Sequence, residues 1–198
     1  MPKPRALRIK HGAEPSSDFD FDLSVRPNGR ALRDAAVLVP LQFYDGAWSV
    51  VLTKRSSKLS HHPGQIAFPG GKVDRRDGST LNAALREAEE EIGLPKSGPL
   101  VLGTLPSHET VSGFLVHPYV AAIPEEFDPK PEIGEVEEIF RVPLSHLMNP
   151  ENYLREGRLW KGDRRYYFTV PYGPYYIWGA TARILKTLSQ SLEGPYAD

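Results

Sequence analysis

Strand-type runs interspersed with a few helical patterns restrict this sequence to a layered fold of the α/β or α+β type. The first apolar run, Ala35–Leu41, is typical of a buried strand, and Trp48–Thr53 is expected to form a hairpin with it. A turn at Tyr44-Asp45-Gly46 separates the two runs. Further strands are expected over Leu100–Leu105, Phe114–Ile123, Val136–Val142 and Tyr166–Val170, with helices over Pro143–Met148 and Ala180–Leu192.

The clearest helix pattern extends from about Ser79 to Ile92. Leucine, alanine and isoleucine recur there at spacings of three and four residues, which forms one apolar stripe. Ser79 and Thr80 are possible N-caps, and Gly93 is a natural helix stop. The members of the predicted stripe are Leu81, Leu85, Ala88 and Ile92.

Composition fits one globular domain, because 40% of the 198 residues are hydrophobic. Residues 31–198 are expected to form that domain, after a charged and proline-containing lead-in over residues 1–30 that is expected to be loosely ordered. The net charge of -1 provides no basic field for a nucleic-acid partner. The absence of cysteine excludes disulfides and thiolate zinc sites.

The chain has no apolar run of membrane-spanning length, and its first ten residues lack the apolar core of a secretory signal. A cytoplasmic protein without a membrane partner is therefore expected. Exposed edge strands or the lead-in can support a homodimer, and the sequence leaves the oligomeric state open.

Three glutamates gather in the last two turns of the predicted helix. Glu87, Glu90 and Glu91 are three and four residues apart, so their carboxylates share one helix face. A solvated acidic face is one interpretation. However, the helix dipole disfavours each anion at this end by about 0.3–1 kcal/mol, and like charges repel further. Carboxylate oxygens are hard ligands, so a bound Mg²⁺ or Mn²⁺ ion explains the cluster better.

The glycine pair Gly70-Gly71 precedes this helix and allows a metal or a phosphate to approach the backbone closely. A tight turn is the alternative explanation. Gly71, Asp77 and the run Arg86–Leu94 together resemble the Nudix box, G-x5-E-x7-R-E-U-x-E-E-x-G-U, where U is apolar. Asp77 stands where the box has glutamate, and the stretch before Arg86 is one residue longer. The resemblance implies an α/β/α sandwich with a mixed sheet and hydrolysis of a diphosphate linkage.

A second stretch, Leu52–Gly71, looks like the signature of the coenzyme A diphosphatases within the Nudix proteins, L-L-T-x-R-S-x-x-L-x-x-H-x-G-Q-x-x-F-P-G-G. Val51 conservatively replaces the first leucine. This resemblance implies conversion of coenzyme A or a derivative to 3′,5′-ADP and 4′-phosphopantetheine. Two alternatives remain: a Nudix diphosphatase acting on ADP-ribose, a dinucleotide or an oxidised nucleotide, and a Nudix-fold binding module without catalysis.

The Nudix resemblance also implies roles for individual residues. The metal ligands would be Glu87, Glu90 and Glu91, joined by the carbonyl of Gly71. Arg86 would orient a catalytic glutamate through a fork-shaped ion pair, which leaves Arg86, Glu87 and Glu90 as the expected catalytic residues. The general base would be Glu87 or a carboxylate from a distant loop, for which the candidates are Glu135, Glu137 and Glu138.

The coenzyme A signature implies that Arg55, His62, Gln65 and Gly70 bind the substrate. Each has an ordinary alternative. Arg55 can be a surface charge at a strand end, and His62 can hold a loop by hydrogen bonds. For the aromatic residues, core or turn packing is the favoured explanation over base stacking. They are Phe68, Tyr166, Tyr167, Tyr172, Tyr175, Tyr176 and Trp178.

Overall fold

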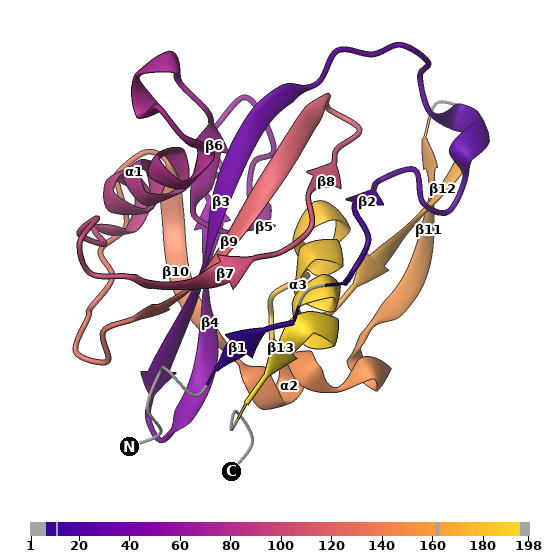
Figure 1. The fold of residues 1–198 in the computed structure, drawn as a ribbon. Coiled ribbons are helices and arrows are strands. Elements are labelled where there is room, and N and C mark those ends of the chain that lie inside the picture. Colours follow the sequence, from indigo (N-terminus) through magenta and orange to yellow (C-terminus); the bar gives the residue numbers. More distant parts are fainter. Residues whose placement is uncertain (1–6, 11, 161–162, 195–198) are drawn as a thin grey trace.

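The computed structural model describes residues 7–10, 12–160 and 163–194 and centres on a mixed β-sheet (Figure 1). The strands of this sheet are β2 (Ser16–Ser17), β3 (Arg33–Tyr44), β4 (Ala47–Arg55), β5 (Ile66–Ala67), β6 (Gly70–Lys72), β7 (Leu100–Thr104), β8 (His108–Glu109), β9 (Phe114–Ile123) and β10 (Val136–Pro143). The helices of the protein are α1 (Thr80–Ile92), α2 (Leu144–Met148) and α3 (Gly179–Ser191). Short 3₁₀ turns are η2 (Leu23–Val25), η3 (Arg75–Asp77) and η4 (Pro150–Asn152).

Strand β3 organises the sheet. It pairs in antiparallel fashion with β4 through the predicted hairpin turn, with Tyr44 opposite Ala47. On its other side it pairs in parallel with β9 over ten residues, from Arg33 opposite Phe114 to Gln42 opposite Ile123. The main order is β10-β4-β3-β9-β8-β2, with β5, β6 and β7 attached to β4, β3 and β9. The sheet is therefore mixed, as expected.

Helices cover both faces of the sheet, with α1 on one side and α2 and α3 on the other (Figure 1). Successive residues of β3 serve the two cores in turn: Leu38 packs with the α1 layer, whereas Val39 and Leu41 pack with the α3 layer. A strand buried on both faces has no polar side, which explains the continuous apolar run in the sequence. The predicted α/β/α sandwich is confirmed.

The helix α1 begins and ends where the sequence indicated. The Ser79 side chain accepts a hydrogen bond from the Asn82 N–H, and Gly93 adopts the left-handed conformation with φ of 71°. The buried stripe is shifted from the predicted one. Leu81 and Leu85 are only half-buried, and the fully buried positions are Ala83, Ala84, Ala88 and Ile92. The small side chains of the three alanines let the helix lie close to the sheet.

The segment before β3 contacts the domain at several places, and short strands form at two of them. Strand β1 (Arg8–Ile9) pairs with β13 (Leu192–Glu193) beside α3. Strand β2 pairs in parallel with β8, where buried His108 contacts Ser16 through Nδ1 (2.9 Å) and Asp18 through Nε2 (3.1 Å). The boundary at residue 31 remains a prediction, and residues 1–6 and 11 of the predicted lead-in lie outside the described residues.

A two-stranded sheet of β11 (Leu154–Trp160) and β12 (Asp163–Thr169) extends beside α3 (Figure 1). The sequence predicted only one strand here, over Tyr166–Val170, because charged residues and a glycine interrupt the apolar pattern in the sequence of β11. Within the part of the chain that the structure describes, no helix is long and apolar enough to cross a membrane.

Candidate active site

The two motif segments meet at β6 and α1. Strand β6 pairs with β3, which places Gly71 opposite Ala36 and directly beneath the helix. A Cβ atom added at Gly71 would lie only 2.5 Å from Oε1 of Glu87. The neighbouring Gly70 N–H donates a hydrogen bond to Oε2 of Glu91 at 3.2 Å. A side chain at Gly71 would therefore displace the Glu87 carboxylate, and a Cβ at Gly70 would lie 2.5 Å from the Ala36 carbonyl oxygen of β3.

Arg86 links the loop before the helix to the acidic cluster. Its Nε and Nη2 donate to the two carboxylate oxygens of Asp77 at 2.8 and 3.0 Å, which is a fork-shaped ion pair. Its Nη1 donates to Oε1 of Glu87 at 2.8 Å and to Oε2 of Glu90 at 3.2 Å. The ion pair with Arg86 lowers the pKa of Asp77 to about 2. Asp77 therefore fixes Arg86, and Arg86 contacts the expected catalytic glutamate.

Of the three clustered glutamates, Glu87 and Glu91 are the two whose carboxylates face into the protein. The side chain of Glu91 is only 6% exposed, and burial raises its pKa to about 7 against the opposing Gly70 hydrogen bond. Burial also raises the pKa of Glu87, although the hydrogen bond from Arg86 opposes this change. The negative charge of Glu87 further raises the pKa of Glu91, so the two carboxylates destabilise each other's charged form.

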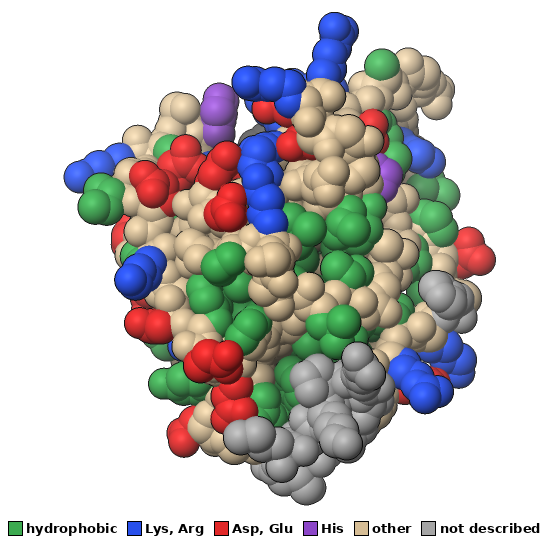
Figure 2. Space-filling model, turned by 60° about the vertical axis from the view of Figure 1, so that its left-hand side comes forward, with side chains coloured by type: hydrophobic (Ala, Val, Ile, Leu, Met, Phe, Trp, Pro, Cys, Tyr) green, Lys and Arg blue, Asp and Glu red, His purple; other side chains and the backbone are tan. Residues whose placement is uncertain are grey.

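Glu90 differs from its neighbours because its side chain is 58% exposed and points to the outer side of α1, where it contacts Arg86. It lines an open hollow there with Asp77 and Lys96. Acidic side chains gather beside lysine and arginine on the face that Figure 2 shows. Among the described residues, no group of three or more acidic or histidine side chains converges as a preformed metal cluster.

The donor set nevertheless fits a divalent ion. Two mutually repelling, largely buried carboxylates beside a glycine backbone offer hard oxygen ligands and an electrostatic need for a cation. Glu87 and Glu91 meet this description in the structure. Glu90 and the Gly71 carbonyl remain predicted ligands.

The three alternative base candidates have different surroundings. Glu137 is engaged by Nζ of Lys54 at 2.7 Å and by the Ser57 N–H at 3.1 Å, and these contacts lower its pKa. Glu138 accepts a short hydrogen bond from the Tyr175 hydroxyl. Glu135 is exposed, and its charge contributes to the raised pKa of both Glu87 and Glu91. Of the three, Glu135 is the one that acts electrostatically on the acidic cluster.

A pocket of about 490 Å³, within the size range of small-molecule sites, opens beside β6. Three of the four predicted substrate-binding residues line it, namely His62, Gln65 and Gly70. The fourth, Arg55, does not. Its Nη1 lies 3.9 Å from Oε1 of Glu91, and its buried Nε has no hydrogen-bond partner among the described residues. The structure places Arg55 at the acidic cluster rather than along the pocket wall.

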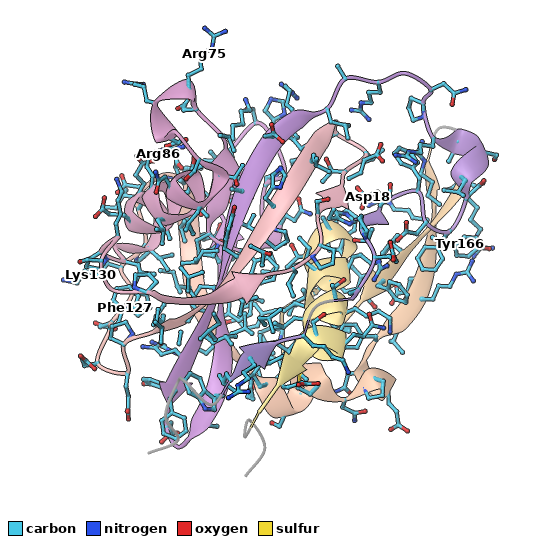
Figure 3. The ribbon with its side chains drawn as sticks, viewed as in Figure 1. Asp18, Arg75, Arg86, Phe127, Lys130 and Tyr166 are labelled. Atoms are coloured by element: carbon cyan, nitrogen blue, oxygen red, sulfur yellow. The ribbon has the colours of Figure 1, made fainter. Side chains whose placement is uncertain are left out.

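The far wall of this pocket contains residues that the sequence did not indicate. Arg158 and Arg165 of the β11–β12 hairpin line it, whereas Lys72 lines the pocket from β6. Tyr166, Tyr167 and Trp178 also line the pocket, although packing was the favoured explanation for them. Figure 3 shows Arg86 on α1 and Tyr166 on the hairpin at opposite sides of the molecule. No spacing motif connects residues this far apart, although the run Arg164-Arg165-Tyr166-Tyr167 in the hairpin was a weak signal.

Comparison with known proteins shows the family of this chain. Residues 32–168 match the NUDIX domain family. The uncharacterized Nudix hydrolase NudL of Citrobacter koseri is 39% identical over 164 residues, which cover 82% of this chain and 85% of that protein. Its namesake from Shigella boydii serotype 18 is 39% identical over 157 residues, with coverage of 79% and 81%.

Solved structures show the same fold. The chain resembles the Nudix hydrolase RenU of M. smegmatis with a TM-score of 0.50 and 24% identity, covering 61% of this chain and 82% of RenU. It resembles a MutT/nudix family protein of Enterococcus faecalis with a TM-score of 0.53 and 18% identity, covering 83% and 63%. The family match and the relatives define a hydrolase of pyrophosphate bonds. The chain belongs to the Nudix family, whose members generally use divalent ions such as Mg²⁺ or Mn²⁺ and act on nucleoside diphosphate derivatives.

Proposed function

We propose that this chain hydrolyses the diphosphate linkage of coenzyme A or one of its derivatives, releasing 3′,5′-ADP and 4′-phosphopantetheine. One observation carries the proposal: the segment that resembles the coenzyme A signature forms the pocket wall and continues directly into the acidic site. His62 and Gln65 line the pocket, and Gly70 both lines it and donates to Glu91. A substrate in this pocket has its diphosphate beside α1.

In this proposal Glu87 and Glu91 hold a Mg²⁺ or Mn²⁺ ion, with Glu90 and the Gly71 carbonyl as further ligands. The bound ion neutralises diphosphate charge and lowers the pKa of the attacking water. Arg86 holds the Glu87 carboxylate in position through its 2.8 Å hydrogen bond. Glu87 accepts the proton of the water, and Glu135 is the alternative base.

Arg55 completes the electrostatics of this end of the pocket. Its guanidinium is close to Glu91 and retains an unused buried N–H, so it can donate to a phosphate oxygen. The cytoplasmic location and the homodimer expected from the sequence remain predictions.

The decisive experiment is product analysis after incubation with coenzyme A and Mg²⁺ in ¹⁸O-labelled water. We expect 3′,5′-ADP and 4′-phosphopantetheine, with the label on one of the two phosphates. ADP-ribose, a dinucleotide and an oxidised nucleotide are assayed in parallel. Turnover of ADP-ribose equal to or faster than that of coenzyme A would overturn the substrate assignment, and a chain inactive on the whole panel would be a binding module.

A further inference from the structure

The cationic residues on the hairpin wall have no role in the hydrolysis itself. Arg158 on β11 and Arg165 on β12 are register partners, directly opposite each other across the two strands. Like charges in this position repel and destabilise the strand pair unless an anion lies between them. Both side chains line the pocket.

Arg165 also carries an unsatisfied donor. Its Nε is buried and has no hydrogen-bond partner within the described part of the chain. Leaving such a donor unpaired costs free energy, and the cost is larger for charged groups. A ligand oxygen in the pocket would satisfy it. The Phe19 ring, whose centroid lies 5.9 Å from the Arg165 guanidinium carbon, does not accept a hydrogen bond from this N–H.

Nearby carboxylates are already engaged elsewhere. Asp18, the acidic residue that lines the pocket, receives hydrogen bonds from the Val111 N–H at 2.7 Å and contacts Nε2 of His108. Glu156, on the same strand as Arg158, accepts a hydrogen bond from the Tyr176 hydroxyl at 2.6 Å. Among the side chains that the structure describes, neither arginine forms an ion pair with a carboxylate, whereas Arg26, Arg55 and Arg183 each do.

We infer that Arg158 and Arg165 bind a second anionic group of the substrate, a phosphate monoester separate from the diphosphate that is cleaved. This inference rests on the proposed function, since coenzyme A carries such a group on its ribose 3′ oxygen. The ribose directs its 3′ and 5′ substituents to different walls of the pocket. The diphosphate then lies at α1 and the monoester at the hairpin. The arginine pair selects the substrate and takes no part in bond cleavage.

The test compares coenzyme A with dephospho-coenzyme A, which lacks only the 3′-phosphate. We expect the wild type to favour coenzyme A in kcat/KM by roughly tenfold to a hundredfold, the value of one or two charge-assisted hydrogen bonds. The double variant Arg158→Gln/Arg165→Gln should lose this preference while its kcat on dephospho-coenzyme A is unchanged. Arg164→Gln is the matched control, because Arg164 is the exposed neighbour on β12 and does not line the pocket.

A binding measurement separates this inference from the proposed function. Calorimetric titration with 3′,5′-ADP and with AMP compares the two ligands without any turnover. A wild type that binds both equally, or a double variant that keeps the difference, would overturn the inference. Loss of the preference in Lys72→Met in place of the arginine variants would assign the group to β6 and also overturn it. Absence of coenzyme A hydrolysis by the wild type would instead refute the proposed function alone.

Discussion

The two ends of the pocket are built in different ways. The acidic end consists mainly of β6, the following loop and α1, which lie within about twenty positions of one another in the sequence, and Arg55 joins it from the end of β4. The hairpin end comes from β11 and β12, more than sixty positions further along the chain. In the proposed function, local spacing therefore determines where the bond is cleaved, whereas the packing of a distant hairpin determines which further group of the substrate is bound.

The largest expected effect is at the acidic end. Replacing Glu87 with glutamine removes a proposed ligand and base, so we expect kcat for coenzyme A to fall by about 10²–10⁴-fold. The ratio of coenzyme A to dephospho-coenzyme A activity should not change, because the hairpin is untouched. Steady-state assays with both substrates measure this.

The control for that variant is Glu89→Gln. Glu89 is on the same helix, but its side chain is 47% exposed and contacts Lys96 at 3.4 Å. It should retain nearly full activity. Full activity in Glu87→Gln would refute the proposed role of the acidic cluster and with it the contrast between the two ends.

Gly71→Ala should have the next largest effect. The added methyl group would lie 2.5–2.8 Å from the Glu87 carboxylate, which must move. Displacement of a catalytic group by about 1 Å can cost about a hundredfold, so we expect a tenfold to hundredfold loss of kcat. The thermal unfolding midpoint should change little, since a side chain yields here and the backbone does not. A variant with normal kcat would show that the Glu87 position is not critical.

Arg86→Lys tests the connection between Asp77 and Glu87. Lysine cannot donate through three nitrogens in a planar arrangement, so it cannot hold both carboxylates. We expect about a tenfold lower kcat, with the substrate preference intact. Arg75→Lys is the control, because Figure 3 shows Arg75 extending away from α1 at the edge of the molecule. A larger change in substrate preference than in kcat would contradict the assignment of Arg86 to the acidic end of the pocket.

The acidic end could be predicted from the sequence because its features are local. Helix spacing placed Glu87 and Glu91 on one face, and the glycine pair indicated a close approach that the structure has between Gly71 and Glu87. The same reasoning gave β4, β9 and α1 within two residues of their observed bounds, whereas β3 extends from Arg33 to Tyr44, beyond the predicted Ala35–Leu41. Short-range periodicity and turn chemistry are sufficient for elements of this kind.

Sequence spacing alone could not give features that depend on tertiary packing. Glu90 shares a helix face with its neighbours by spacing, yet Arg86 holds it on the outer side of α1. Leu81 was expected in the core, but the sheet packs against Ala83 and Ala84 instead. The pairing of Arg158 with Arg165 depends on strand register, which no local pattern in a charged hairpin determines.

The smallest expected effect concerns stability. The pKa of Asp77 is lowered to about 2 in the folded chain from an ordinary value of 3.8, chiefly by its hydrogen bonds with Arg86. A carboxylate with a lowered folded pKa stabilises the native state fully above its unfolded pKa and loses that contribution as the pH falls. Asp77→Asn should therefore lower the free energy of unfolding at pH 7 by about 1 kcal/mol, and the difference from wild type should shrink between about pH 4 and pH 2.

Urea denaturation of both proteins across this pH range measures the difference. Asp45→Asn, in the β3–β4 turn, is the control and should show no comparable change with pH. A difference between Asp77→Asn and wild type that stays constant down to pH 2 would mean that the Arg86 ion pair does not stabilise the loop. In that case Asp77 would not fix the position of Arg86, and Arg86 would contact Glu87 without that support. The residues of the acidic end would then not act as one connected unit.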